Sequence, residues 1–405
     1  MWTVVLLVGK GRFCVRASWI LPLVFCCQLL GQTHGAQQRW ATNLREAHGF
    51  QTFERPRTQL WYTQQGVAFI TPDRLAVYQV NEKLAPAPLA GRDVSGGAGN
   101  FFLYVKILDA HDGHEIKSMR LPTSGSFSQI VSGQSGNFFV RTGDVLYLVS
   151  PDFKVLASKP LPLDRVAPFE QWQIRVPHSG AAIVLVHQQL FIHESVLATG
   201  EILSPGTSKA DVEILDSGTL KVLKRVSLPH YLAHWSAGER FLVGTHPNQP
   251  HHAEEFGLLD FDGRWQELKP ALKTDVPCAP IMDALDHQLI VAYGCAGIVV
   301  FPPSGGNVFS SSGRGNEVPL RVDSFMNYLA IEFFSLPSPQ HPTTKPLHID
   351  LYDVKSGTHL IALSLHKNLV SYDVSAQGSL AVVEGDTLTM FEPGNDQTSL
   401  RAPGP

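Results

Sequence analysis

The chain has 405 residues, a formal net charge of −4 and an apolar fraction of 44%. Charged residues make up only 17%, against about a quarter in an average protein. This profile excludes a disordered chain, a coiled coil and a polytopic membrane protein. No basic tract stands out, so nucleic acid is not an expected partner.

The first 36 residues differ from the rest of the chain. A basic stretch is followed by an apolar run over 19–31 and then by small residues, which is typical of a secretory signal peptide. The run is shorter than the roughly 20 residues that span a bilayer as a helix. We therefore expect residues 1–36 to be removed, with cleavage after Gly35 or Ala36. The mature chain would be periplasmic or extracellular and would carry no integral membrane span.

Two other interpretations of this leader remain open. An uncleaved leader would anchor the chain to the membrane. A lipoprotein would be modified at Cys26 or Cys27, but the bulky Phe25 fits poorly beside a processing site that requires small residues. Both are weaker than a cleaved signal peptide.

The cysteines that remain after export form one pair. Three of the five leave with the leader, and Cys278 and Cys295 stay in a compartment that permits disulfides. The segment between them is typical of two short strands around a turn at Asp286–His287. An antiparallel hairpin would place the two cysteines opposite each other, within reach of a disulfide.

Three segments of the mature chain repeat one pattern of strand, acidic turn with glycine, and strand. They span residues 105–122, 212–229 and 349–365. Asp and Ser side chains bond backbone amides in such turns, and Gly supplies the positive φ. The turns recur about every 40–50 residues, and a period of that length with four short strands per unit is typical of a β-propeller.

The repeats predict an all-β fold, a seven-bladed β-propeller of four-stranded antiparallel blades. The ring would be closed by the mature N-terminal segment, between Gln37 and Phe53, pairing with the last blade. We expect one propeller domain over 37–395 and a flexible tail over 396–405. The predicted blades are 60–122, 126–163, 169–229, 232–270, 278–316, 318–366 and 369–393.

The repeats at 105–122, 212–229 and 349–365, behind an export signal, resemble those of secreted bacterial seven-bladed propellers of the YVTN or quinoprotein-like, WD40-like type. The resemblance covers nearly all of the mature chain, but its motifs are architectural. No Trp-Asp dipeptide ends a strand, and no blade carries the regular Trp of quinone-docking repeats. The resemblance therefore implies a fold and no cofactor, and propellers host enzymes, binding proteins and scaffolds alike.

The long connections are predicted between the second and third strands of a blade, and such connections share one face of a propeller. They are 81–100, 188–210, 246–254 and 335–346. Long loops above a rigid scaffold are common binding sites. We expect this loop-rich face to bind a protein, a peptide or an envelope glycan.

The densest group of metal-binding side chain types lies at this predicted face. Imidazole and carboxylate groups in such numbers can bind zinc or another divalent metal, although the spacing matches no known zinc motif and a solvated loop explains it as well. The group consists of His230, His234, His246, His251, His252, Glu254 and Glu255.

Three functions follow from these patterns. The favoured one is an exported, non-catalytic binding or scaffolding module without a cofactor. The alternative is a metal-dependent propeller enzyme, a hydrolase, lactonase or lyase, that uses the histidine-rich group near the channel mouth. The third is a structural domain in a larger envelope assembly.

Overall fold

The structure is a computed structural model. It describes 36–52, 65–82, 101–123, 129–133, 136–142, 145–161, 170–176, 182–189, 210–228, 233–237, 241–246, 255–260, 264–268, 281–285, 289–294, 297–312, 317–335, 345–366 and 369–394. Apart from the short helix α2 (Leu44–His48), the elements of these ranges are β-strands. Within them, no helix has both the length and the apolar character needed to cross a membrane.

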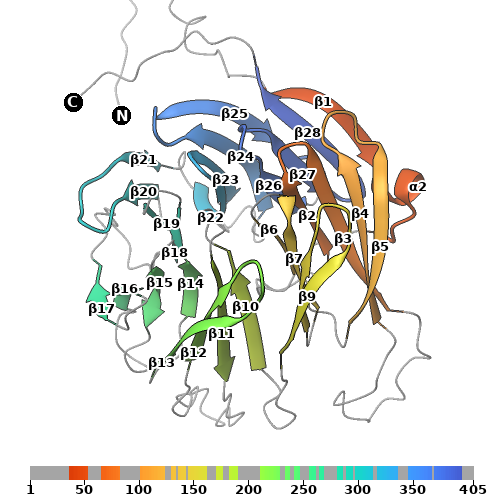
Figure 1. Ribbon diagram of the computed structural model, residues 1–405. Helices are drawn as coiled ribbons and strands as arrows, with labels where there is room; N and C mark the ends of the chain where they lie inside the picture. Colours follow the sequence, from red (N-terminus) through yellow and green to blue (C-terminus); the bar gives the residue numbers. More distant parts are fainter. Residues whose placement is uncertain are drawn as a thin grey trace, which may run out of the picture.

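The described strands form seven four-stranded antiparallel sheets, arranged as the blades of a β-propeller (Figure 1). Two sheets follow each other at the start of the chain. The first contains β2 (Gln65–Thr71), β3 (Arg74–Glu82), β4 (Phe101–Asp109) and β5 (Glu115–Thr123). The second contains β6 (Gln129–Ser132), β7 (Phe138–Thr142), β8 (Val145–Val149) and β9 (Val155–Pro160).

The next three sheets repeat the same order of consecutive strands. The third contains β10 (Glu170–Arg175), β11 (Ala182–Gln189), β12 (Ala210–Asp216) and β13 (Val222–Leu228). The fourth contains β14 (Ala233–Ala237), β15 (Phe241–His246), β16 (Glu255–Asp260) and β17 (Trp265–Glu267). The fifth contains β18 (Ile281–Ala284), β19 (Ile290–Gly294), β20 (Gly297–Phe301) and β21 (Phe309–Ser312).

The last sheet combines the two ends of the described chain. The sixth sheet is still consecutive, with β22 (Glu317–Phe325), β23 (Tyr328–Ser335), β24 (Lys345–Asp353) and β25 (Thr358–Ser364). The seventh contains β26 (Leu369–Val374), β27 (Leu380–Glu384), β28 (Thr387–Pro393) and, as its outer strand, β1 (Ala36–Asn43). β1 pairs antiparallel with β28 from Ala36, opposite Pro393, to Asn43, opposite Thr387.

Each sheet has one inner strand, and these inner strands gather around the centre of the ring in Figure 1. They are β2, β6, β10, β14, β18, β22 and β26, and we count the strands of each sheet from the inner one outward. The first and last sheets meet there through the N–H groups of Val67 and Phe69 on β2. These groups donate to Ser371 Oγ, over 3.4 Å, and to a carboxylate oxygen of Asp373 on β26. Apolar side chains fill the space between neighbouring sheets, so the core is divided into layers that each belong to two blades.

The connections define two faces of the disc. Those between the first and second and between the third and fourth strands share one side, which we call the turn face. Those between the second and third strands share the opposite side, which we call the loop face. The long segments predicted from the sequence do connect second to third strands, but most of their residues lie outside the described ranges.

The acidic turns between third and fourth strands form as the repeats predicted. Asp109 Oδ1 accepts the N–H of His111, over 2.7 Å, and Asp353 Oδ1 accepts that of Lys355, over 3.0 Å. Gly113 and Gly357 supply the positive φ, at 78° and 70°.

The prediction that glycine supplies the positive φ is wrong for the third sheet. There Leu220 takes it, at 58°, and in the second sheet Phe153 does, at 65°. A non-glycine residue pays about 1–2 kcal/mol for this conformation. Both side chains offset that cost by packing, since Leu220 is buried in the core and Phe153 contacts the ring of Phe138 edge-on.

Candidate functional site

The inner strands of four sheets end around one cavity on the turn face. Its volume is about 200 Å³. Side chains and backbone from the first, second, sixth and seventh sheets line it, namely Phe69, Ile70, Thr71, Pro72, Ser132, Gly133, Gly136, Phe325 and Ala376. We call it the axial pocket. Its lining is mainly apolar, with hydroxyl groups on Thr71 and Ser132 only.

Three carboxyl groups lie at matching positions on inner strands, and two of them are connected to this pocket. Asp283, Asp323 and Asp373 are opposite Val291, Ala330 and Ala381 on the second strands of the fifth, sixth and seventh sheets. These are equivalent positions in three successive blades, and we call the group the axial carboxyl cluster. Asp323 precedes the pocket residue Phe325 by two positions, and Asp373 accepts the N–H of the pocket residue Phe69.

Two members of the cluster bond each other across neighbouring sheets. The side chains of Asp323 and Asp373 are hydrogen-bonded, which requires a proton on one of them. Burial of Asp373, followed by the nearby negative charge of Asp323, raises the pKa of Asp373 well above its ordinary value. The protonated carboxyl therefore ties the sixth sheet to the seventh, while Phe69 ties the seventh to the first.

Two tyrosines and an arginine surround these carboxyls. Tyr293 donates to Asp283 Oδ2 over 3.2 Å, and Tyr372 donates to the backbone oxygen of Arg321 over 3.0 Å. The Arg321 guanidinium lies 4.6 Å from the centre of the Tyr372 ring. Burial, more than any charged neighbour, raises the pKa of both tyrosines well above the ordinary value. Both hydroxyls therefore stay protonated and act as donors.

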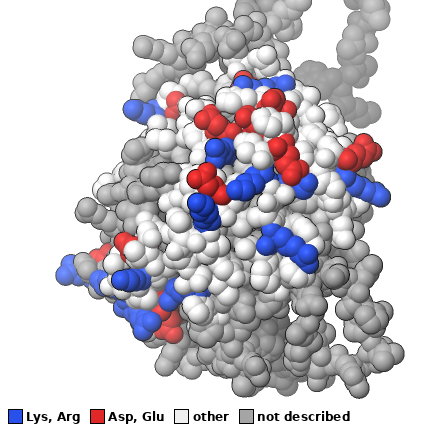
Figure 2. Space-filling view, turned by 45° about the vertical axis from the view of Figure 1, so that its right-hand side comes forward, with Lys and Arg blue, Asp and Glu red and all other residues white. Residues whose placement is uncertain are grey.

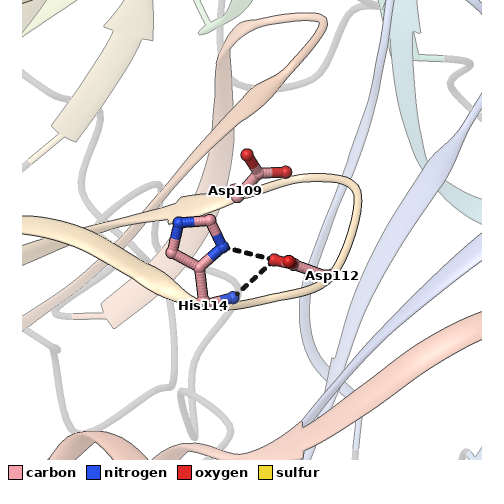
Figure 3. A group of neighbouring side chains, drawn as sticks. All are labelled: Asp109, Asp112 and His114. Atoms are coloured by element: carbon pink, nitrogen blue, oxygen red, sulfur yellow. Dashed lines mark hydrogen bonds and ion pairs between the residues drawn. The ribbon is translucent and has the colours of Figure 1, made fainter.

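A separate group with metal-ligand chemistry lies in the turn between β4 and β5. Possible ligand atoms of Asp109, Asp112 and His114 all lie within 4.8 Å of one another, and Figure 3 shows the three side chains around the turn. Asp112 Oδ1 accepts both the backbone N–H of His114, over 3.0 Å, and its ring Nδ1, over 2.6 Å. Asp109 already accepts the N–H of His111. The carboxylates thus form the turn, and we assign no metal to it.

The ionisation of this turn agrees with a local hydrogen-bond network. The backbone N–H of His114, and then its ring, lower the pKa of Asp112. The bond to Asp112 raises the pKa of His114. Both groups are exposed, so the interaction adds little to stability.

The structure places part of the histidine-rich group on strands of the fourth sheet. His246 ends β15 and is directly opposite Glu255, which begins β16. His234 lies on β14, the neighbouring strand. From the sequence we expected it in the connection that precedes this strand, and that prediction is wrong. These three positions share the loop-face end of one sheet. His230, His251, His252 and Glu254 lie outside the described residues, as do Cys278 and Cys295.

The axial carboxyl cluster was missed by sequence analysis. A signal for it exists, since Asp283, Asp323 and Asp373 all stand seven or eight residues before the paired residue of the following strand. Aligning the repeats on their first hairpin, instead of on the turn between third and fourth strands, would bring the three aspartates into register. The pocket has no such signal, because four different sheets supply its lining.

Searches with the sequence found no matching protein-family model and no matching curated protein. Solved structures do resemble the fold. The acylaminoacyl peptidase of Pyrococcus horikoshii, uncomplexed, matches with a TM-score of 0.51 and 10% identity over 82% of this chain and 51% of that chain. Its orthorhombic crystal form gives 0.50 and 11% identity over 85% and 50%. The WD40 β-propeller domain of Doa1 gives 0.41 and 9% identity over 89% and 98%.

These similarities concern the fold alone. The chain spans about half the length of the peptidase that it matches, and identities near 10% carry no active-site residue across. Function must therefore be argued from the site.

Proposed function

We propose that this chain is an exported seven-bladed β-propeller that binds a protein or peptide partner without catalysis. The ring would be closed by β1, and the seven four-stranded sheets and the pairing of β1 with β28 support this arrangement. Export rests on the signal-like leader. The axial pocket is the observation that carries the binding role, because it is a cavity between the strand ends of four sheets in a rigid scaffold.

The lining of the pocket favours a polypeptide over a glycan. Phe69, Ile70, Pro72 and Phe325 offer apolar contact, and a cavity of about 200 Å³ matches one apolar side chain in scale. A sugar would need a set of converging polar groups. The partner would therefore insert an apolar anchor residue from a loop or a chain end.

The exposed apolar side chains also favour the turn face as the side that binds the partner. Among the described residues, every exposed large apolar side chain lies within two positions of a turn on this face. These are Ile116, Val155, Leu156, Val222, Leu223, Val308 and Met326. Exposed apolar groups on one face of a molecule are typical of a protein-binding surface. The loop face, favoured by the sequence, remains a second proposed contact region.

The test is site-specific photo-cross-linking in the envelope of the source cell. A photoreactive residue replaces Ala376 at the pocket or, as the control, the exposed Ser304 on the same face. We expect a defined protein adduct from position 376 that disappears when Ser132→Trp fills the pocket. No adduct at 376, or an adduct indifferent to Ser132→Trp, would refute binding at the pocket.

The metal-dependent enzyme is the second candidate. It is favoured by the placement of His234, His246 and Glu255 at one end of the fourth sheet. Metal analysis of protein purified without chelators tests it. A stoichiometric metal that is lost in His246→Ala would support the enzyme and count against the non-catalytic role.

A further inference from the structure

The outer strand of the third sheet has an unusual surface. β13, with the residue before it, carries Lys221, Lys224 and Arg225 and no acid. Between these cations lies Leu223, which is 63% exposed and is the most exposed large apolar residue in the described part of the chain. Figure 2 shows lysine and arginine side chains at the lower left of the molecule, with acidic side chains beside them.

The acidic groups near β13 are already engaged. Glu213 on β12 binds Arg225 Nε at 2.9 Å and Lys159 Nζ of the second sheet at 3.1 Å. Asp211 accepts the hydroxyl of Ser227. Asp216 holds the turn through Thr219, and this bond lowers the pKa of the Asp216 carboxyl. The Arg225 side chain nevertheless remains 70% exposed.

Among the described strands, none pairs with the outer edge of β13. β13 is the last strand of its sheet and pairs with β12 on one side. It has seven residues and no proline. A strand of this kind can accept a further strand from another polypeptide, through main-chain hydrogen bonds, with its side chains selecting the partner.

We propose that the edge of β13 binds an extended acidic segment of another protein, with an apolar side chain against Leu223 and carboxylates near Lys224 and Arg225. Cross-strand pairs of opposite charge stabilise such an addition, whereas like charges oppose it. The three cations therefore disfavour pairing with a second copy of this edge. An anionic lipid surface would satisfy the charges but would leave the main-chain edge unpaired. This surface is separate from the axial pocket.

A selection of random short peptides displayed on phage against the mature protein tests the proposal. We expect selected peptides that alternate acidic and apolar residues. Leu223→Asp and Lys224→Glu should each weaken their binding about tenfold or more. The matched control is Ser118→Asp, which places the same charge at an exposed position on β5, the outer strand of the first sheet, and it should leave binding unchanged.

Two further measurements distinguish an added peptide strand from an anionic lipid surface as the partner of β13. N-methylation of alternate amides in a selected peptide should abolish binding in one of the two alternations, because a strand pairs through every second residue. Vesicles that contain phosphatidylserine should bind no more strongly than phosphatidylcholine vesicles. Basic peptides, indifference to Leu223→Asp, tolerance of N-methylation in both alternations, or preferential binding to the anionic vesicles would each overturn the proposal.

Discussion

The indole N–H of Trp40 donates to the backbone oxygen of Ala110 over 2.9 Å. These residues are 70 positions apart, and their bond joins β1, the outer strand of the seventh sheet, to the turn between β4 and β5 of the first. The Trp40 ring also packs on Gly113 in that turn. The N-terminal strand thus contacts the first sheet as well as the last.

Gly113→Ala tests this contact. A Cβ at Gly113 would lie 2.9 Å from Cε3 of Trp40, and the backbone there must keep a φ of +78°. Because both the ring position and the backbone conformation oppose a side chain, we expect a loss of about 2–3 kcal/mol in the free energy of unfolding. Urea denaturation followed by tryptophan fluorescence measures it.

The matched control for that variant is Gly357→Ala. Gly357 occupies the equivalent turn of the sixth sheet with a φ of +70°, but a Cβ there would meet nothing within 4 Å. Only the cost of the backbone conformation applies, about 1 kcal/mol. Equal losses for the two variants would show that Trp40 does not constrain the turn.

The pairing of Asp323 with Asp373 predicts a dependence of stability on pH. In the folded protein Asp373 keeps its proton above the range in which an unfolded aspartate, with a pKa of about 4, loses it. The folded state then binds more protons than the unfolded state. The free energy of unfolding should therefore decrease as the pH rises from about 4 through the folded-state pKa of Asp373.

The variant Asp373→Asn distinguishes the contribution of the Asp373 proton to this pH dependence from that of the other ionisable groups. An asparagine can still accept the N–H of Phe69 and donate to Asp323, but it does not ionise. We expect the urea midpoint of the variant to vary less between pH 4 and pH 8 than that of the natural chain. In Asp112→Asn, which removes an exposed aspartate with a lowered pKa, the decline toward high pH should persist. A natural chain that gains stability as the pH rises would contradict the shared proton.

The sequence predicted the blades through features that each hairpin carries locally. The turns at Asp109 and Asp353 form because each carboxylate accepts a backbone N–H group two residues further along the chain. Such a contact can be predicted from a short stretch of sequence. Leu220 takes the positive φ that we expected of a glycine, because its side chain packs in the core against the neighbouring sheet. The axial pocket brings together Phe69, Ser132 and Phe325 from three different sheets, a juxtaposition that no local pattern encodes.

The proposed disulfide between Cys278 and Cys295 lies outside the described residues, but the strands between the two cysteines are described. β18 and β19 pair antiparallel as predicted, with Ile281 opposite Tyr293. This register is one residue away from the one expected from the sequence, in which the two cysteines are directly opposite each other. We expect the exported protein, denatured without reductant, to contain no free thiol. Reduction should lower its stability by about 3 kcal/mol, because the disulfide restricts the unfolded chain. Two titratable thiols before reduction would refute the bond.

Deleting residues 36–43 tests whether β1 closes the ring. The deletion would leave the edge of β28 without its partner and remove Trp40 and Arg39, which contact Ala110 and His111 of the first sheet. An exposed strand edge promotes association. We expect the truncated protein to aggregate and to lose its single cooperative unfolding transition, as measured by light scattering and urea denaturation. A synthetic peptide spanning 36–52, added during refolding, should restore the monomer, whereas removing residues 396–405 should have no effect. A monomeric deletion variant with the midpoint of the natural chain would show that the ring holds together without this strand.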